Sequence, residues 1–424
     1  MTHSTPLSLR KTDRIILHID FDSFFASVEQ QYNPLFRGKP LGVTATNGRN
    51  CIIASSREAK KLGIGTATRV HDARRIYPDI LLTGANFRRY WEESQKFIKI
   101  CKDFSPYVEV FSIDELFMDI SKTAHLFGGT DILIKHIKQR IAKEIGTYIT
   151  VSIGVSYNKM LAKMGSGLHK PDGISKITKE NVFSIYAIAP LTAICGIGER
   201  IKARLHRMGI YTLLQLQKIP TEKLIAEFGN VEGMFLKHVG LGVDESEVIP
   251  YTEKPSVKSV GRQYCLPQNE YDKRVVLQNI YELCEEVTLK LRRLSKKSRS
   301  AGVYIRGTHI IKGHKTHKMY FSTGKDMFAI CSGILMAEKE SFYHGYVRQI
   351  GVWAGYLQDV FHTPLSLFDC AKSEKLLETI DILNEKFGDH TIRNGFLLYA
   401  DKLTTVPNGW MADTYERTKL ASAF

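Results

Sequence analysis

Acidic residues end apolar, strand-like runs at two places in the chain, and this arrangement constrains the fold more than any other feature of the sequence. The run 15–19 suits a buried strand by its length and β-branched content, and it leads into Asp20 and Asp22. The second pair, Asp114 and Glu115, lies between two further apolar runs that are typical of antiparallel strands. Neighbouring strands of one sheet would bring the two acidic pairs together.

Crowded carboxylates have a chemical consequence. They repel one another and raise each other's pKa, so such a cluster is normally held by cations. Mg²⁺ prefers carboxylate and phosphate oxygens, and two such ions roughly 3.5–4 Å apart serve in-line phosphoryl transfer. Either acidic pair alone is more typical of a solvated turn or a helix cap, so the metal assignment depends on the surrounding sequence.

The segment after the second acidic pair has the periodicity of a helix and then of a strand. Residues 132–145 place isoleucines on one stripe and basic residues elsewhere. Residues 149–155 alternate in character, which predicts a half-buried strand. The resulting order of strand, helix, strand, strand, helix, strand is the split βαβ arrangement of ferredoxin-like domains. The sequence therefore predicts an α+β fold.

Composition narrows the class of protein but decides less. A chain of 424 residues has room for two to four domains, and a net charge of +15 with a pI near 9.3 favours a polyanionic partner. The seven cysteines include no Cys-x-x-Cys pair, which indicates reduced thiols rather than disulfides or zinc ligands. No apolar run approaches the ~20 residues of a membrane span, and the first residues lack a secretory core. We expect a cytoplasmic protein that acts on the nucleoid.

Seven short motifs, in a specific order and spacing, are more informative. They occupy residues 20–29, 38–40, 58–63, 112–115, 154–159, 170–173 and 196–198. In these motifs the chain resembles the Y-family, or DinB/UmuC-like, translesion DNA polymerases, from about residue 14 to about residue 357. The resemblance implies a multidomain α+β fold with a ferredoxin-like palm, small fingers, a helix-hairpin-helix thumb and an α/β little finger.

The resemblance also implies where each domain lies. The expected domains are the palm at 1–23 and 87–175, the fingers at 24–86, the thumb at 176–242, a polar linker at 243–257, the little finger at 258–357 and a C-terminal tail at 358–424. In this family small fingers leave the nascent base pair loosely enclosed, which admits damaged templates and lowers fidelity.

Carried over one residue at a time, the family's metal site falls on the acidic pairs. Asp20 and Asp114 would bridge two Mg²⁺ ions, and Glu115 would hold the catalytic ion near the primer 3′-hydroxyl. The backbone carbonyl of Phe21 would ligate the nucleotide-bound ion, whereas Asp22 is expected to support the site without binding metal. Catalysis would then rest on positioning and charge neutralisation.

The nucleotide site combines an aromatic gate with a departure from the family. Phe25, preceded by Phe24, matches the steric gate, a ring that leaves a ribose 2′-hydroxyl neither room nor a hydrogen bond. Where DinB-type members have Tyr and Arg for the triphosphate, this chain has Arg57 and Lys60, and a lysine lacks the bidentate fork. Arg57 either replaces that contact or faces solvent. Lys170 matches a family lysine that reaches the same phosphates.

Two features are expected to hold DNA. Gly196 and Gly198 precede apolar residues at helical spacing and resemble a helix-hairpin-helix, whose tight turn directs backbone N–H groups at a phosphate. An ordinary αα-turn is the alternative. The little finger is dense in basic residues, for which a second DNA grip is favoured over a solvated charged face. The basic residues expected to contact DNA are Arg262, Arg292, Arg293, Lys296 and Lys297.

The tail contains one peptide with a resemblance of its own. Residues 363–369 look like the sliding-clamp peptides of bacterial polymerases, in which an extended segment buries apolar anchors in a pocket. The anchors would be Leu365, Leu367 and Phe368, and Pro364 replaces the usual glutamine. A packed strand of the little finger is the alternative. Residues 376–383 have helical spacing.

The function implied is template-directed, low-fidelity DNA synthesis past damaged template, with a role in the SOS response and a mutator effect. Its partners would be primer-template DNA, deoxynucleoside triphosphates, two Mg²⁺ ions and a sliding clamp. The main alternative is a catalytically silent Y-family adaptor, but such members typically lose the metal carboxylates that this chain retains. A helix-hairpin-helix nuclease would need neither Phe25 nor the 170–173 motif. No exonuclease acids are evident, so proofreading is not expected, and DinB-type and UmuC-type features are mixed.

Overall fold

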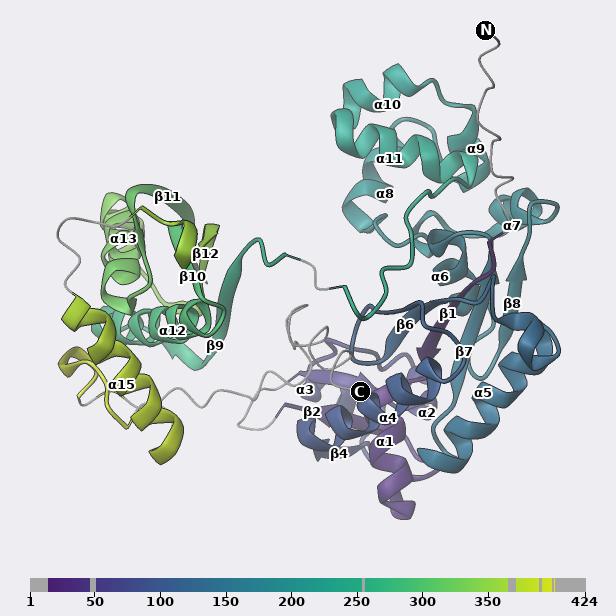
Figure 1. The fold of residues 1–424 in the computed structure, drawn as a ribbon, viewed down its shortest axis with the longest axis horizontal. Coiled ribbons are helices and arrows are strands. Elements are labelled where there is room, and N and C mark those ends of the chain that lie inside the picture. The colour runs from purple at the N-terminus through teal and green to yellow at the C-terminus, as the bar shows by residue number, and fades with distance from the viewer. Residues whose placement is uncertain are drawn as a thin grey trace, which may run out of the picture. The chain divides into compact units, whose positions relative to one another are not determined.

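The computed structural model describes residues 14–45, 51–253, 256–364, 371–388, 391–398 and 400. The chain divides into two compact units, with the boundary between residues 255 and 256. We call them the N-terminal unit and the C-terminal unit, and their elements are labelled in Figure 1. Within the described ranges no helix is both long and apolar enough to cross a membrane.

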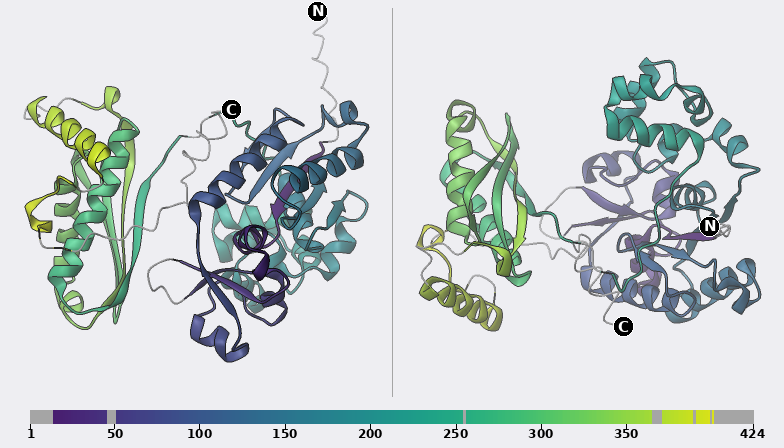
Figure 2. Two further views of the ribbon diagram at one scale, coloured as in Figure 1. Left: turned by 90° about the horizontal axis from the view of Figure 1, so that it is seen from below. Right: turned by 45° about the horizontal axis from the view of Figure 1, so that its top comes forward.

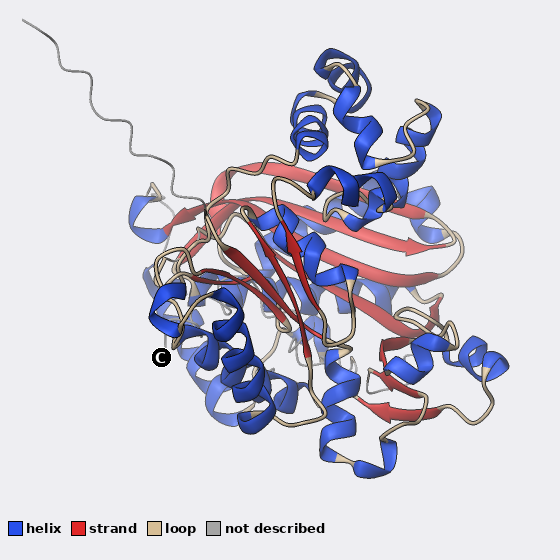
Figure 3. Ribbon diagram, turned by 90° about the vertical axis from the view of Figure 1, so that its right-hand side faces the viewer, coloured by secondary structure: helices blue, strands red, loops and turns tan. Residues whose placement is uncertain are grey.

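A five-stranded sheet forms the centre of the N-terminal unit, and strands are red in Figure 3. Its order is β5-β6-β1-β7-β8, and neighbours are antiparallel except for the parallel pair β7 and β8. The strands are β1 (Ile16–Phe21), β5 (Val108–Val110), β6 (Glu115–Asp119), β7 (Val151–Ser156) and β8 (Ile174–Ile177). Strands β1, β5, β6 and β7 keep the predicted ferredoxin-like order, which is thereby confirmed. Strand β8 adds a further strand at one edge of the sheet.

Helices cover both faces of this sheet. Helices α4 (Phe87–Lys102) and α5 (Thr130–Glu144) pack on one face, and α6 (Lys159–Leu168) packs against β1 and β7 on the other. The prediction that the strand at 149–155 is half-buried was wrong, because α6 covers its second face and all six residues of β7 are buried. Gly154 permits this close approach, since a Cβ there would lie 1.9 Å from the carbonyl oxygen of Ala162.

The side chains of β1 alternate between these two layers. Leu17, Ile19 and Phe21 are buried in the core that includes α4 and α5. His18, also fully buried, lies on the α6 side, within hydrogen-bond distance of a serine on that helix. Because alternate side chains of a strand share a face, Asp20 lies on the same side as His18.

A smaller three-stranded sheet follows β1 in the chain. Its order is β3-β2-β4, with β2 parallel to β4 and antiparallel to β3. The elements of this region are β2 (Leu41–Thr44), β3 (Ile52–Ser55), β4 (Leu81–Gly84), α1 (Phe24–Tyr32), α2 (Arg57–Lys61) and α3 (Val70–Ile76). It has a small buried core of its own, centred on Ile52 and Ile64.

The rest of the N-terminal unit is helical. Its helices are α7 (Val182–Ile188), α8 (Glu199–Arg207), α9 (Leu213–Lys218), α10 (Thr221–Phe228) and α11 (Asn230–Leu241). They bury leucines from every helix but α7 in one core. Gly233 lets α11 approach α10 closely, since a Cβ there would lie 2.7 Å from the backbone of Ile225.

Most of the segment predicted as a linker is attached to the N-terminal unit. The backbone N–H of Met160 donates to Asp244 over 2.9 Å, and that of Ile249 donates to Glu109 over 2.8 Å. Val248 is only 5% exposed. The division between the two units therefore comes at the end of this segment rather than along its whole length.

The C-terminal unit is a four-stranded antiparallel sheet with helices on one face. The order is β11-β10-β12-β9. The elements are β9 (Val260–Glu270), α12 (Lys273–Arg293), β10 (Lys296–Gly307), β11 (Ile310–Phe321), α13 (Gly324–Ala337), α14 (Lys339–Tyr343) and β12 (Val347–Asp359). The strand residues Ala301, Val303 and Ile305 pack with α12 and α13 in one core.

Residues beyond β12 add a further layer to this unit. The predicted tail helix is confirmed as α15 (Ala371–Phe387). Arg292 of α12 binds Asp381 of α15 through two contacts of 2.6 and 2.7 Å, and Arg292 also donates to the carbonyl of Ser322. Leu397, in a short 3₁₀ helix, is fully buried. This part of the tail is thus packed on the unit.

We predict that Asp381→Ala lowers the free energy of unfolding of the C-terminal unit by about 1.5–3 kcal/mol, the range for hydrogen bonds to charged groups. The change removes the two carboxylate acceptors of the Arg292 guanidinium and leaves that half-buried charge with the carbonyl of Ser322 alone. Denaturant unfolding of the whole chain measures the effect. Glu385→Ala, at an exposed position of the same helix, is the matched control, and equal effects of the two changes would contradict the prediction.

Candidate active site

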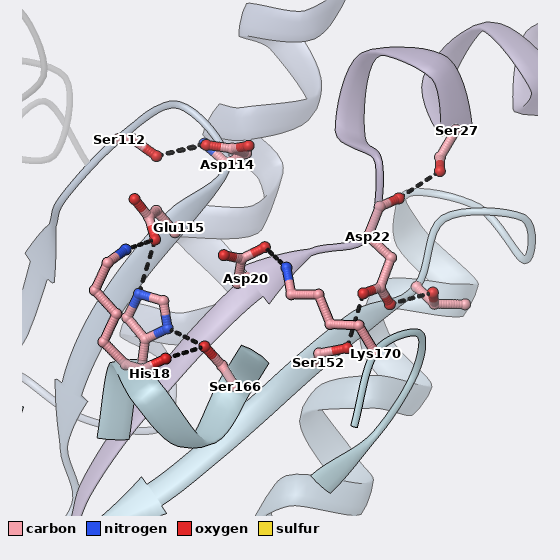
Figure 4. Close-up of polar contacts among 12 residues, drawn as sticks. His18, Asp20, Asp22, Ser27, Ser112, Asp114, Glu115, Ser152, Ser166 and Lys170 are labelled. Carbon is pink, nitrogen blue, oxygen red and sulfur yellow. Dashed lines mark hydrogen bonds and ion pairs between the residues drawn. The ribbon is translucent and has the colours of Figure 1, made fainter. Parts of the chain in front are cut away.

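The predicted acidic residues come together at one end of the five-stranded sheet (Figure 4). In the strand register Asp20 of β1 lies opposite Glu115 of β6 on one side. The backbone N–H of Phe21 donates over 3.0 Å to the carbonyl of Asp114. The carboxylates predicted from two distant parts of the chain therefore meet because β1 and β6 are neighbours.

Burial disfavours the charged forms of two of these carboxylates, and the neighbouring groups offset only part of this effect. It raises the pKa of Asp20, and the ammonium of Lys170, which donates to this carboxylate, offsets only part of the shift. Burial also raises the pKa of Asp114, although Ser112 Oγ donates to it over 2.5 Å. Both residues therefore favour an additional positive charge nearby.

Glu115 differs, because basic groups surround it. His18 Nε2 lies 3.0 Å from its Oε2, and the ammonium of Lys163 donates to the same oxygen. Burial alone would raise the pKa of Glu115, but the contacts with His18 and Lys163 outweigh it and lower the pKa to about 2. Glu115 is thus ionised throughout the physiological range.

His18 is a site residue that the sequence analysis missed. Its Nδ1 lies 2.7 Å from Ser166 Oγ on α6, and burial lowers its pKa. One signal was present in the sequence, since a single polar residue interrupts an apolar strand two positions before Asp20 and so shares its face.

The donor atoms of this cluster fit a hard cation. Single ligand atoms of His18, Asp20 and Glu115 lie within 4.8 Å of one another. Carboxylate oxygens dominate the set once Asp114 is included, and oxygen is the ligand that Mg²⁺ prefers. The raised pKa values of the two aspartates agree with such a site, because a cation would stabilise their charged forms.

Both carboxylate oxygens of Asp22 accept hydrogen bonds from neighbouring residues. Thr150 and Ser152 hydroxyls donate to it over 2.7 Å each, and the backbone N–H of Asp172 donates over 2.8 Å. The side chain is 3% exposed. It therefore ties β7 to the turn that carries Lys170, and Figure 4 shows its contact with Ser152.

Phe25 belongs to a stack of aromatic rings. Its ring is 4.2 Å from that of Tyr90 at an interplanar angle of 12°, and Phe87 meets it edge-on. The hydroxyl of Tyr90 donates over 2.7 Å to the buried Glu29. Phe24 stacks instead on Phe21. The stack holds the Phe25 ring in one place, and the supporting role of Tyr90 was not foreseen.

The predicted phosphate-binding cations are close enough to affect one another. Burial and then the charge of Lys170 lower the pKa of Lys60. Arg57 is half-buried and donates to the hydroxyl of Thr150. Its Nε is buried and has no hydrogen-bond partner among the described residues. Asp20 and Asp22 offset only part of the shift in the pKa of Lys60, so an anion beside Lys60 would stabilise its charged form.

The predicted DNA-binding residues comprise two glycines in the thumb region and basic residues of the C-terminal unit, several of which contact carboxylates. Gly196 has φ of +108°, and a Cβ there would lie 2.7 Å from the ring of Phe235, while Gly198 directly precedes α8. Arg262 lies 3.3 Å from Glu286, and Lys296 contacts Asp359. Together with Arg292, these two cations are paired inside the C-terminal unit.

Arg293 is exposed and Lys297 half-buried. The clamp-peptide residues Leu365, Leu367 and Phe368 lie outside the described residues.

We predict that Asp114→Asn raises the melting temperature in metal-free buffer at pH 7. The folded state raises the pKa of Asp114, so its ionisation costs stability above that pKa, and the cost disappears as the pH falls towards the ordinary aspartate value. The gain from Asn should shrink over the same pH range. Asp79→Asn, at an exposed position, should show no such gain, and a lower melting temperature for Asp114→Asn would contradict the prediction.

Comparisons with known proteins cover most of the chain. Family models match at residues 19–167 (impB/mucB/samB family), 192–244 (DNA polymerase-iota, thumb domain) and 257–367 (impB/mucB/samB family C-terminal domain).

DNA polymerase IV of Pelotomaculum thermopropionicum is 32% identical over 382 residues, which span 89% of this chain and 94% of that protein. DNA polymerase IV of Acetivibrio thermocellus is 32% identical over 405 residues, 91% of this chain and 98% of that protein. A solved Y-family DNA polymerase chimera of Dbh and Dpo4 matches with a TM-score of 0.69 and 26% identity, over 81% of this chain and 99% of that chain.

The order of the sheet, the meeting of the acidic residues and these similarities agree, and the chain belongs to the Y-family of DNA polymerases.

Proposed function

We propose that this protein is a template-directed, low-fidelity DNA polymerase that extends a primer past damaged template by two-metal nucleotidyl transfer. The observation that carries the proposal is the convergence of Asp20, Asp114 and Glu115 at one end of the central sheet. The relatives named DNA polymerase IV support it. The expected setting is the nucleoid in the cytoplasm, with a role in the SOS response and a mutator effect.

The metal site would use the residues expected from the family. Asp20 and Asp114 would share two Mg²⁺ ions, Glu115 would complete the site for the primer 3′-hydroxyl, and the Phe21 carbonyl would face the nucleotide. Bound there, the ions would supply charge neutralisation at the reacting phosphate and a lower pKa for the attacking hydroxyl. His18 and Lys163 would orient Glu115 through their contacts with Oε2.

The triphosphate would bind at the group of cations beside the acids. Arg57, Lys60 and Lys170 would each direct charge at phosphate oxygens, and the burial of Lys60 supports this role because a polyanion would offset its lowered pKa. Arg57 would take over the forked contact that Lys60 cannot make. Lys170, now paired with Asp20, would exchange that partner for phosphate once Mg²⁺ neutralises the aspartate.

The division of labour among domains is part of the proposal. We assign the palm to residues 1–23 and 87–175, the fingers to 24–86, the thumb to 176–242 and the little finger to 258–357. The thumb would hold duplex backbone at Gly196 and Gly198, and the little finger would add a second basic grip, to which Arg293 and Lys297 would contribute. The peptide 363–369 would bind a sliding clamp.

Two other functions compete with this proposal. A silent Y-family adaptor would have no need to keep all three metal carboxylates in register. A helix-hairpin-helix nuclease would have no need for the ring of Phe25, held by Tyr90. Primer extension and strand cleavage on one end-labelled substrate distinguish the three functions directly.

We predict that Asp20→Asn reduces primer extension in Mg²⁺ by at least about a thousandfold, because losing a shared metal ligand removes several kcal/mol of transition-state stabilisation. Primer-template binding, measured by fluorescence anisotropy, should change little, since the basic groups remain. Asp79→Asn is the control. Extension by Asp20→Asn at the wild-type rate would refute the metal assignment. Cleavage without extension by the wild-type chain would favour a nuclease, and neither activity would favour an adaptor.

We predict that Phe25→Ala raises the use of ribonucleotides relative to deoxynucleotides by at least about tenfold, since the ring no longer opposes a 2′-hydroxyl and a clash or an unpaired hydroxyl costs about 1–3 kcal/mol. Single-nucleotide incorporation with each sugar gives the ratio, which cancels any general loss of folding. Phe97→Ala, a change in the core of the same unit, should leave the ratio unchanged. The same ratio in both variants would assign Phe25 to the core alone.

A further inference from the structure

One oxygen atom joins two segments that carry cations of the triphosphate site. Oδ2 of Asp22 accepts a hydrogen bond from the hydroxyl of Thr150 over 2.7 Å and another from the backbone N–H of Asp172 over 2.8 Å. Thr150 also accepts a hydrogen bond from the guanidinium of Arg57, and Asp172 follows closely after Lys170 in the chain. This oxygen therefore connects the segment of Arg57 with the segment of Lys170.

The connection to Arg57 runs through the hydroxyl of Thr150. A threonine hydroxyl has one proton to donate and can accept at the same time, and here it donates to Asp22 and accepts from Nη2 of Arg57. Arg57 is the first residue of α2, and Thr150 comes directly before β7. Both segments belong to the N-terminal unit, whose elements run from purple to teal in Figure 2. The hydroxyl therefore fixes the guanidinium relative to the central sheet.

The connection to Lys170 runs through the backbone of its turn. Asp172 has a φ of +58°, which lies in the left-handed region and costs conformational energy for a residue other than glycine. Its N–H donates to Asp22, and the ammonium of Lys138 donates to its carbonyl over 2.5 Å and to its Oδ1 over 2.8 Å. These contacts oppose the conformational cost. Asp22 therefore helps to hold the backbone that carries Lys170.

We propose that Thr150 and Asp22 are positioning residues for the triphosphate, and that together they set the spacing between Arg57 and Lys170. Two cations bind a polyphosphate more tightly when their positions are fixed beforehand, because less conformational freedom is then lost on binding. Neither positioning residue would touch the nucleotide. The inference rests on the proposed function and adds to it the groups that organise the phosphate-binding cations.

The test measures nucleotide binding without catalysis. The full chain is assembled with Mg²⁺ on a primer-template whose primer ends in a dideoxynucleotide, so that no bond can form. The matching deoxynucleoside triphosphate is titrated in, and the resistance of the complex to competitor DNA reports binding. Thr150→Val keeps the shape but removes the hydroxyl, and it should weaken nucleotide binding about tenfold, a loss within the range for a hydrogen bond to a charged group. Thr150→Ser keeps the hydroxyl and should restore most of the binding.

Two serines of β7 provide matched controls. Ser152 donates to the other oxygen of Asp22 over 2.7 Å, and Ser156 donates to the carbonyl of Ile177 over 2.8 Å. Both serines are buried. Ser152→Ala should weaken nucleotide binding less than Thr150→Val, and Ser156→Ala should leave it unchanged. A loss in Ser152→Ala equal to that in Thr150→Val would overturn the proposal, because a general disturbance of the strand would explain both.

A double-mutant cycle tests the connection to Arg57. If Thr150 acts by holding Arg57, Thr150→Val should cost less nucleotide affinity in an Arg57→Ala background than in the wild-type chain, because the group that it positions is gone. Fully additive losses would contradict this connection. Asp22→Asn should weaken nucleotide binding more than Thr150→Val, since both connections depend on Asp22. Unchanged nucleotide affinity in Asp22→Asn would contradict the connection to Lys170.

Failure of this inference and failure of the proposed function give different results. A wild-type chain that neither binds the nucleotide on this primer-template nor extends an ordinary primer would contradict the proposed function, and this inference with it. Nucleotide binding by the wild-type chain, with equal binding by Thr150→Val, would contradict this inference alone. The melting temperature and the primer-template affinity of each variant are measured alongside, so that a loss of folding or of DNA binding is recognised.

Discussion

The position of β1 between β6 and β7 is the constraint on which the site depends. Because the strand is buried on both faces, its alternation is forced, with Leu17 and Ile19 in the core below α4 and α5 and His18 towards α6. Asp20 therefore emerges on the His18 side at the end of the strand, opposite Glu115. A shift of one residue in this register would exchange the two faces and separate the acids.

Without bound ligands, burial disfavours the charged forms of both acidic and basic groups in the site. Burial raises the pKa of Asp20 and Asp114, while burial and a neighbouring ammonium lower the pKa of Lys60. Ionisation of the two aspartates and of Lys60 destabilises the folded protein. Bound cations and a polyphosphate would stabilise these charged groups together. The surrounding core offsets their cost to folding, and in the proposed function the same charges would hold the substrates.

Local periodicity predicted the elements but not the layers. The helices at 132–145 and 376–383 and the strand ending at Asp20 were readable from the sequence because each has an apolar pattern of its own. The full burial of β7 was not, since alternation within a strand reports one covered face and says nothing of a second helix. The attachment of the supposed linker depends on single contacts, such as Asp244 with Met160, that leave no pattern.

The sequence by itself determined the family and the order of strands and helices, and it predicted the acidic, aromatic and basic residues of the proposed site, because these are carried by short motifs and local spacing. Only the tertiary structure decided which charges meet. Lys170 reaches Asp20 across 150 residues, and Arg292 binds Asp381 across 89. The partner of each basic residue depends on which strand or helix packs beside it, which no local pattern records.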